Sequence, residues 1–398
     1  MLSAVADSEI DINPTPAAHF GAGAIAKLPG IVRGIGCDTA VIVTDAALAA
    51  TPVVARVAGV LADAGVTVST FAGIHPNPTT VDVAAGAAAV MDAAARSGRV
   101  ALVAVGGGSP IDAAKGIALA AVNPQRGRDL DYHGEFRVPA LPIVAVPTTA
   151  GTGAETNAFG VVTDPQTRRK FYVGHASSLP AAAVLDPDLT VGLPPHATAA
   201  TGMDALTHAL ECYLSIRANP WSDGIALQVI RMIAANLPQA CADGADREAR
   251  AQMLLAAHMA GIAMAGTGLG ICHAIGHAIG ARFDIPHGVA LSMVLPQVLE
   301  FNAPVCTDRL ADVAVALGAG QPARTAGWNA GAAITAITSI AGQVGMTHAM
   351  ADFGISAADF GQIAADALDD EVLANTPRRP DAADIRSILL AAQGRQGQ

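Results

Sequence analysis

Up to about residue 190 the chain alternates between short runs of β-branched residues and alanine-rich stretches with helical periodicity. This alternation is typical of βαβ units, in which helices join parallel strands. The clearest predicted strands are Thr39–Thr44, Val100–Val105 and Ile143–Val146, and the predicted connecting helices are Val53–Ala64 and Val81–Ala95. We therefore predict an α/β fold with a Rossmann-like parallel sheet in this part of the chain.

After this region the character of the sequence changes. β-branched runs disappear, and long Ala/Leu/Ile segments with helical periodicity continue to the C-terminal end. The change falls near Gly192–Pro195, where the sequence Gly-Leu-Pro-Pro interrupts any regular element. A chain of 398 residues also exceeds the size that one hydrophobic core normally serves. We therefore predict an α/β domain over residues 1–192 and an all-α domain over residues 193–398.

The all-α part carries a carboxylate and several imidazoles at helical spacing. Asp204 and His208 lie four residues apart, as do His273 and His277, and His287 follows after a short loop. Four residues is about one helical turn, so each pair projects from one face of a helix. Imidazoles with one carboxylate form a ligand set that suits iron(II) or zinc better than calcium or magnesium. The spacing predicts a class of metal ion and leaves open which imidazoles bind it.

A simpler alternative is that these pairs are core histidines with ordinary hydrogen-bond partners. So much polarity in otherwise apolar helices argues against it, because each buried group without a partner costs on the order of 1–3 kcal/mol. One metal ion would satisfy several of these groups together. The expected chemistry is Lewis-acid activation of an oxygen atom.

A glycine-rich turn in the first half is suited to bind a phosphate. Gly106–Asp112 directly follows the strand Val100–Val105 and leads into a helix that is predicted to begin near Ala113 and that carries Lys115. Glycines let backbone N–H groups approach a phosphate closely, and a helix N-terminus adds its positive dipole end. A tight strand-to-helix turn explains the glycines nearly as well, since the motif is neither G-x-G-x-x-G nor a P-loop.

Two further polar segments follow strands of the same sheet. Thr148–Gly153 follows Ile143–Val146 and offers hydroxyls and flexible backbone to a pyrophosphate or ribose. Asp45 closes the first strand, where an acidic residue accepts hydrogen bonds from an adenosine ribose and repels a 2′-phosphate. Asp45 is equally suited to be a helix N-cap. A nucleotide site in one domain and a metal site in the next, with a cleft between them, indicate a two-substrate enzyme.

Composition removes several other classes of protein. The net charge is −11 and no run of Lys or Arg is present, which excludes an electrostatic footprint for nucleic acid or an anionic membrane. Five scattered cysteines without a C-x-x-C pair predict neither a disulfide framework nor a thiolate zinc site. The first residues are acidic and lack an apolar signal-peptide region, and no later segment is a convincing membrane span. We expect a cytoplasmic protein.

Together these motifs resemble the iron-containing (group III) alcohol dehydrogenase family, with a layout close to that of lactaldehyde reductases and propanediol dehydrogenases. The resemblance implies a dehydroquinate synthase-like two-domain architecture. It covers nearly the whole chain, and its strings occur in family order. They are VTDAAL, HPNPTT, AVGGGSPIDAAKGIAL, PTTAGTGAE, VTDPQTRRKF, TGMDALTHALE, GLGICHAIGHAIGARFDIPHGVA and, near the C-terminus, ALDD.

The resemblance assigns roles within the metal motif. It implies that the metal ligands are Asp204, His208, His273 and His287, and that His277 is a nearby non-ligand histidine at the substrate. We hypothesise hydride transfer between a metal-bound small primary alcohol or aldehyde and nicotinamide, with His277 relaying the hydroxyl proton toward solvent. The alternative for His277 is that it only orients a ligand.

The implied cofactors are NAD and one divalent metal ion, for which iron(II) is expected and zinc is the alternative. The implied NAD contacts are Asp45, Asn77, Gly107, Gly108, Ser109, Asp112, Thr148, Thr149 and Lys170. The acid at position 45 is implied to go with NAD rather than NADP. By position, the residues that resemble the pocket lining of the family are Phe159, Met264, Leu269 and Val372. All four are apolar, which favours a small primary alcohol or aldehyde over a polyol.

Other functions are less consistent with these residues. The nearest alternatives are maleylacetate reductase, a relative that works without metal, and a glycerol dehydrogenase-like enzyme. The usual departures of maleylacetate reductase from the four-ligand pattern are absent. A metal-dependent hydrolase or lyase is more distant, and a non-catalytic binding protein leaves His277 without a purpose. The hydrophobic content of 52% and the oligomeric state that is usual in the family indicate a homodimer or larger homo-oligomer. Neither nucleic-acid nor membrane partners are expected.

Overall fold

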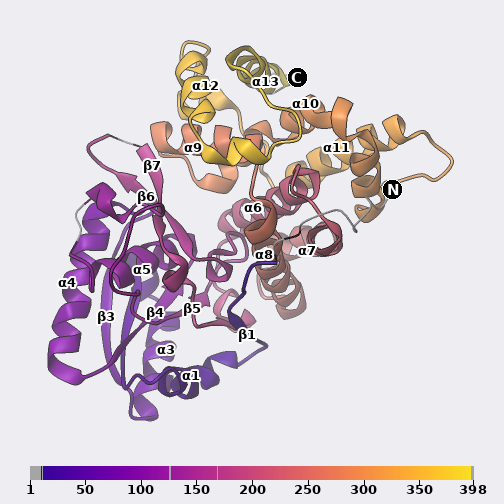
Figure 1. The fold of residues 1–398 in the computed structure, drawn as a ribbon. Helices are drawn as coiled ribbons and strands as arrows, with labels where there is room; N and C mark the ends of the chain where they lie inside the picture. The colour runs from indigo at the N-terminus through magenta and orange to yellow at the C-terminus, as the bar shows by residue number, and fades with distance from the viewer. Residues whose placement is uncertain (1–9, 11, 125–126, 168, 396–398) are drawn as a thin grey trace. The chain divides into compact units, whose positions relative to one another are not determined.

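Six parallel strands form the predicted sheet in the first part of the chain. The computed structural model describes residues 10, 12–124, 127–167 and 169–395 (Figure 1). The strands pair in the order β1-β8-β5-β4-β2-β3, and every pair is parallel. Their bounds are β1 (Ala17–Phe20), β2 (Thr39–Asp45), β3 (Thr67–Ile74), β4 (Val100–Gly106), β5 (Ile143–Pro147) and β8 (Ala182–Leu185). The central strands β4 and β5 are buried along their whole length, as expected for a sheet with helices on both faces.

Alternate residues of these strands belong to two different cores. Val41 and Leu102 pack with α4 (Thr80–Ser97) and α5 (Gly108–Ala120) on one face. Ile42 and Val103 pack with α1 (Leu28–Gly34) and α3 (Pro52–Asp63) on the other. Successive strand residues point to opposite faces, so this division follows directly from the strand period. The sheet and its connecting helices were predicted, and the predicted helices correspond to α3 and α4.

Shorter elements complete this unit. A two-stranded antiparallel hairpin, β6 (Phe159–Asp164) with β7 (Arg169–Gly174), was not predicted from the sequence. A short helix, α2 (Ala46–Ala49), follows β2. The 3-10 turns are η2 (Ala24–Lys27), η3 (Gly127–Leu130), η4 (Ala154–Thr156), η5 (Ala176–Ser178) and η6 (Pro187–Leu189).

From Pro194 onward the described residues contain helices and no strand, which confirms the predicted all-α region. Compact packing divides the chain between Leu193 and Pro194, and residues 12–14 belong with the helical unit. The predicted lack of a signal peptide falls mainly on residues 1–9 and 11, which lie outside the described residues. The helices are α6 (Pro195–Leu214), α7 (Pro220–Ala242), α8 (Arg247–Thr267), α9 (Ile271–Phe283), α10 (His287–Ala316), α11 (Ala326–Gln343), η7 (Met350–Phe353), α12 (Phe360–Leu368), η8 (Glu371–Asn375) and α13 (Ala382–Arg395).

Glycines let the helices around α6 approach closely. A Cβ atom at Gly202 of α6 would collide with Leu237 of α7, and one at Gly288 of α10 would collide with the carbonyl group of Ala200 of α6. The α10 glycine therefore meets backbone, which cannot move aside as a flexible side chain can. These contacts fix the start of α10 against α6, and both helices carry residues of the metal motif.

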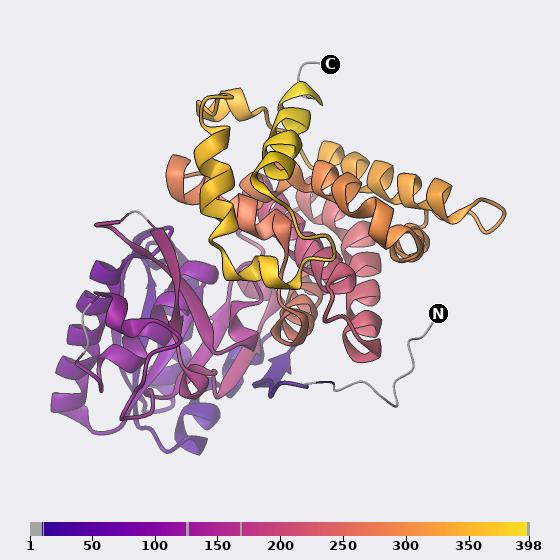
Figure 2. The ribbon, with the colours of Figure 1, turned by 45° about the horizontal axis from the view of Figure 1, so that its top comes forward.

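Among the described residues, two helices, α7 and α10, are long and apolar enough to cross a membrane by length and composition alone, and the sharply bent pair α8 and α9 would be a third if it counted as one span. The sequence suggested no convincing span. In the structure α7 packs against α6 and α8, and α11 lies along α10 (Figure 2). Much of the apolar surface of α10 is buried against these neighbours. A helix that is apolar on most sides is expected in the core of a helical bundle as well as in a membrane, so burial accounts for the composition of α10.

Candidate metal centre and dinucleotide residues

Three helices bring the predicted metal ligands together. Asp204 and His208 lie one turn apart on α6, His273 lies on α9, and His287 is the first residue of α10. The Asp204 Oδ1 atom lies 3.4 Å from His208 Nε2, 3.6 Å from His273 Nε2 and 3.6 Å from His287 Nε2. Three imidazole nitrogens therefore surround one carboxylate oxygen.

The donor atoms of this cluster fit a divalent cation. The ligand atoms of Asp204, His208 and His273 all lie within 4.8 Å of one another, and all three residues are buried. Among the described residues, Asp204 Oδ1 and His273 Nε2 are buried side-chain atoms without a hydrogen-bond partner. Leaving such atoms unsatisfied is costly, and a cation between them removes that cost. The mixed N/O set suits iron(II) or zinc, as the spacing predicted.

Glu211 holds the His273 ring in the orientation that a ligand needs. His273 Nδ1 donates to Glu211 Oε2 at 2.6 Å, since a carboxylate accepts and does not donate. The Glu211 oxygens also accept the backbone N–H groups of Gly270 at 3.0 Å and Cys272 at 2.6 Å. Because Nδ1 donates to Glu211, Nε2 is the nitrogen that faces Asp204 and that a cation would use. Glu211 was not predicted as a site residue, although it stands one turn beyond His208 in the string TGMDALTHALE.

The carboxylates around His273 set the protonation of the metal-free site. Burial alone would lower the pKa of His273, but the carboxylates of Glu211 and Asp204 raise it to about 9. Burial would raise the pKa of Glu211, and the His273 ring together with the two backbone N–H donors lowers it below its usual value. Metal ligands must be deprotonated at the binding atom, so a cation that enters this site displaces a proton.

His277 lies beside the cluster and has its own carboxylate partner. Its Nδ1 donates to Asp370 Oδ2 at 2.7 Å, and its ring stacks on His287 with centroids 5.3 Å apart. The other Asp370 oxygen accepts the backbone N–H of Val372 at 3.1 Å, which fixes the carboxylate at the start of η8. Asp370 is the last residue of the string ALDD, and no role was predicted for it. The pairing leaves His277 Nε2 as the atom that can accept a proton.

Three of the predicted pocket residues belong to neighbouring segments of the helical unit. Met264, at the end of α8, and Leu269, in the loop that follows, are buried, and Val372 of η8 is half-buried. Gly268 has φ +65°, and a Cβ atom there would collide with the Asn375 side chain of η8. The loop after α8 and η8 are therefore in contact. The fourth residue, Phe159, lies in the α/β unit, where its ring makes edge contacts with two tyrosines.

The two glycine- and threonine-rich loops of the α/β unit lie against each other. A Cβ atom on Gly107 would stand 3.1 Å from the Thr149 side chain, and one on Gly108 would stand 2.8 Å from the Thr152 side chain. Thr148 N also donates to the Gly106 carbonyl oxygen at 2.9 Å. The structure thus brings together two segments that the sequence separates by about 40 residues. The first of them includes the N-terminal end of α5.

Helix α5 begins at Gly108, and the predicted start near Ala113 was wrong. Pro110 is tolerated because the N–H groups of the first turn have no partner within a helix, so proline loses no hydrogen bond there. The longer helix places Ser109 and Asp112 in its first turns rather than in a loop. Lys115 is fully buried further along, so it does not belong to the predicted phosphate cradle.

The remaining predicted dinucleotide residues also make defined contacts. Lys170 Nζ donates to Asn77 Oδ1 at 3.0 Å, and Asn77 has a left-handed backbone conformation with φ +52°. Asp45 Oδ1 accepts the Leu48 N–H at 2.8 Å, so it caps α2 as the alternative interpretation expected. Asp112 Oδ2 accepts the Val161 N–H at 3.1 Å. Burial raises the pKa of the Asp112 carboxyl to about 6, although the lysines nearby act in the opposite direction.

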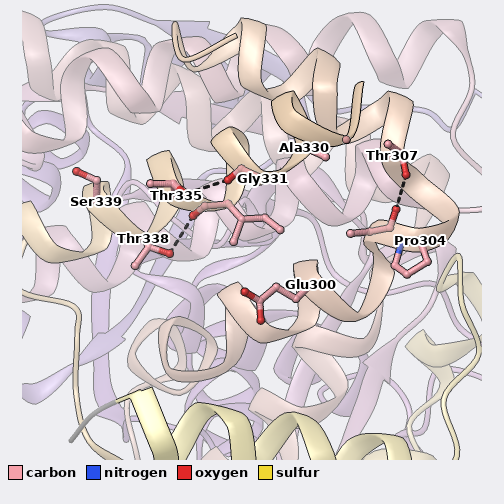
Figure 3. Close-up of a pocket in the computed structure, with 11 residues that line it drawn as sticks. Glu300, Pro304, Thr307, Ala330, Gly331, Thr335, Thr338 and Ser339 are labelled. Carbon is pink, nitrogen blue, oxygen red and sulfur yellow. Dashed lines mark hydrogen bonds between the residues drawn. The ribbon is translucent and has the colours of Figure 1, made fainter. Parts of the chain in front are cut away.

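A separate pocket of about 850 Å³ lies between α10 and α11 (Figure 3). Its wall includes Glu300 and a row of small and hydroxyl side chains. The Thr307, Thr335 and Thr338 hydroxyls donate to carbonyl oxygens one turn back in their own helices, at 2.8, 3.0 and 2.9 Å. These donors are used within the helices, and none of the metal or dinucleotide residues lines this pocket.

Comparison with known proteins places the chain in a family. Residues 15–187 match the iron-containing alcohol dehydrogenase family, and residues 198–393 match the C-terminal part of the same family. The chain belongs to the iron-containing alcohol dehydrogenases, and it is a metal-dependent oxidoreductase of alcohols and aldehydes. The resemblance stated from the motifs is thereby confirmed.

Several individual proteins of known name are similar to this chain over most of their length. The probable alcohol dehydrogenase EutG of Escherichia coli (strain K12) is 41% identical over 316 residues, which cover 79% of this chain and 78% of that protein. The NAD-dependent methanol dehydrogenase of Bacillus methanolicus is 37% identical, with 95% and 98% of the two chains covered. The crystal structure of a 1,3-propanediol oxidoreductase superposes with a TM-score of 0.92 at 36% identity, covering 97% and 100%. Relatives named lactaldehyde reductase and 1,3-propanediol dehydrogenase also match, as the layout of the motifs predicted.

Proposed function

We propose that the protein interconverts a small primary alcohol and its aldehyde with NAD as the hydride acceptor or donor. The observation that carries the proposal is that Asp204 Oδ1 lies 3.4 to 3.6 Å from three imidazole Nε2 atoms, two of them on the buried residues His208 and His273 and the third on the partly exposed His287. In this proposal the cation is held by Asp204, His208, His273 and His287. When bound, the cation supplies Lewis-acid chemistry that lowers the pKa of a substrate hydroxyl and so eases the loss of hydride from its carbon. Iron(II) is the expected ion and zinc the alternative.

His277 Nε2 takes up the hydroxyl proton during alcohol oxidation and returns it during aldehyde reduction. Asp370 holds the ring through Nδ1, so the same tautomer is presented in every cycle. The side chain of His277 is 14% exposed, which gives the proton a route toward solvent. Met264, Leu269 and Val372 place apolar groups in the same unit and would surround a short carbon chain. Phe159 is assigned to the pocket by its position in the family.

The dinucleotide is held by the two loops that meet at the start of α5. The backbone N–H groups of Gly107, Gly108 and Ser109 would face the pyrophosphate, and the Thr148 and Thr149 hydroxyls would bind beside them. Lys170 and Asn77, joined by their hydrogen bond, would contact the same dinucleotide, as would Asp112. Asp45 would accept hydrogen bonds from the adenosine ribose. NAD is also the coenzyme in the name of the methanol dehydrogenase relative.

The substrate belongs to the class of short primary alcohols, diols and aldehydes. This proposal rests on the apolar pocket residues and on the relatives, whose names specify methanol, 1,3-propanediol and lactaldehyde. The four intact metal donors count against the metal-free maleylacetate reductase reaction. We also propose that the protein acts in the cytoplasm as a homodimer or larger homo-oligomer, and that it needs no nucleic acid or membrane.

The proposal is tested by NADH absorbance with a panel of short alcohols, diols and glycerol. Activity is measured on the protein as purified, after chelation, and after iron(II) or zinc is added back, while metal content is determined in parallel. Alcohol-dependent NAD reduction that is lost on chelation and restored by metal supports the function. Metal-independent oxidation of NADH by maleylacetate would contradict it. Absence of any absorbance change would favour a hydrolase or lyase.

A further inference from the structure

Lys115 is a fully buried cation at the centre of α5. Its side chain is among the largest that are entirely enclosed, with 0% exposure. An ammonium group without partners is very costly to bury, so the hydrogen-bond partners of this group indicate its role. Lys115 Nζ donates to Ala154 O at 2.7 Å, to Asn157 Oδ1 at 2.8 Å and to Phe159 O. These bonds use all three protons of the ammonium group.

All three acceptors belong to one short segment, 154–159. It joins the threonine-rich loop 148–153 to β6 and contains only the single turn η4. Asn157 Oδ1 accepts the Phe159 N–H at 3.2 Å as well, so the amide oxygen and the ammonium group together fix the entry into β6. The ammonium group also lies 5.8 Å from the centre of the Phe159 ring. The shape of this segment therefore depends on Lys115.

One turn earlier, Asp112 connects α5 to the next residues of the same strand. Its Oδ2 accepts the Val161 N–H at 3.1 Å, and its Oδ1 lies 3.9 Å from Lys115 Nζ. Gly160 packs directly on this turn, because a Cβ atom there would stand 2.6 Å from the Asp112 carbonyl oxygen. Two charged side chains of one helix face thus hold successive residues of one strand. The Asp112 carboxylate and that of Glu155 favour the charged form of Lys115, although burial dominates and lowers its pKa to about 8.

The loop 148–153 is consequently fixed from two sides. Gly107 and Gly108 contact the side chains of Thr149 and Thr152 at the start of α5, and Lys115 holds the segment that follows the loop two turns further along the helix. We propose that Lys115 is a positioning residue for the dinucleotide. It does not touch the cofactor, and it keeps the loop 148–153 in the shape that binds the cofactor. This inference rests on the proposed use of NAD.

Lys115→Met tests the inference because methionine keeps the length and the apolar stem but cannot donate to the three acceptors. We expect the dissociation constant for NADH to rise at least tenfold, as measured by titration of nicotinamide fluorescence on the full-length, metal-loaded protein. The KM for NAD should rise in parallel. Asn157→Ala, which removes only one acceptor, should raise the same constant by a smaller factor. If Lys115→Met fails to fold, the NADH affinity of Asn157→Ala tests the inference instead.

Asn123→Ala is the matched control. Asn123 is buried just beyond the opposite end of α5, where it exchanges two hydrogen bonds with the Val138 backbone at 2.7 and 3.0 Å. The Asn123→Ala variant should be less stable in urea than the wild-type protein but should bind NADH with the same affinity. If Lys115→Met and Asn157→Ala keep wild-type affinity, or if affinity falls in all variants in proportion to stability, the inference is overturned. Wild-type protein that binds no NADH would overturn the proposed function, and this inference with it.

Discussion

Replacing Glu211 with glutamine should weaken metal binding without unfolding the protein. The two carboxylate oxygens accept from three donors, Gly270 N, Cys272 N and His273 Nδ1. A glutamine has only one oxygen, and its NH₂ group must face at least one of these N–H donors. The variant therefore loses at least one hydrogen bond to a charged acceptor, and the His273 ring loses the charge that holds it.

The expected loss is about 10- to 100-fold in metal affinity, which is the usual effect of removing an outer partner of a ligating histidine. At about 1.4 kcal/mol for each factor of ten, this corresponds to about 1.4–2.8 kcal/mol. The assay is competition with a chelator of known affinity, for zinc and, without oxygen, for iron(II). Circular dichroism establishes that the helical content is retained.

Glu248→Gln provides the control, because it makes the same chemical change at an exposed position of α8. It should leave metal affinity unchanged. Equal affinity of Glu211→Gln and the wild-type protein would refute the reasoning, since it would mean that the orientation of His273 does not depend on Glu211. So would a loss of affinity that appears equally in the control.

Four further changes test other parts of the structure. His277→Ala should lower kcat by about 10²- to 10⁴-fold with metal content unchanged, and normal turnover would show that the residue only orients a ligand. Gly288→Ala should cost about 1–3 kcal/mol in urea unfolding because its Cβ atom meets backbone of α6, whereas Gly327→Ala, with open space around it, should cost little. Between about pH 8 and 10.5 the unfolded chain binds the Lys115 proton and the folded chain does not, so Lys115 contributes a rise of stability with pH, whereas the raised pKa values of His273 and Cys212 contribute a fall. Lys115→Met should therefore make the slope of stability against pH more negative than in the wild-type protein, as urea unfolding at both limits will show. Asp45→Asn should raise kcat/KM for NADPH relative to NADH, and an unchanged ratio would exclude its proposed selectivity.

Most of the fold could be predicted from the local periodicity of apolar residues. The strands were predictable because buried parallel strands are continuous apolar runs, and the helical unit because its apolar residues recur at helical spacing. The hairpin of β6 and β7 was missed, because its strands are only partly buried. The start of α5 was missed because glycine and proline usually mark loops, while the first turn of a helix accepts both.

Spacing along one helix predicted which residues of the metal motif share a face, and the resemblance to the family supplied the choice of ligands, which stays a prediction. The residues that hold their rings were not predictable in the same way. Glu211 is 62 positions from His273, and Asp370 is 93 positions from His277. No periodicity connects such distant residues, and only the tertiary packing brings them together. The same holds for Lys115, whose acceptors lie about 40 residues further along the chain.

The position of His287 at the first residue of α10 has a thermodynamic consequence. The four donors come from three helices that only tertiary packing brings together, so the binding site does not exist in the unfolded chain. A cation that binds only the folded form shifts the folding equilibrium toward it, by an amount that grows with the ratio of free metal to its dissociation constant. Metal supply would then govern the lifetime of the protein as well as its turnover. In a cell short of metal, a larger fraction of chains would be exposed to proteolysis, and the amount of enzyme would report the availability of the ion.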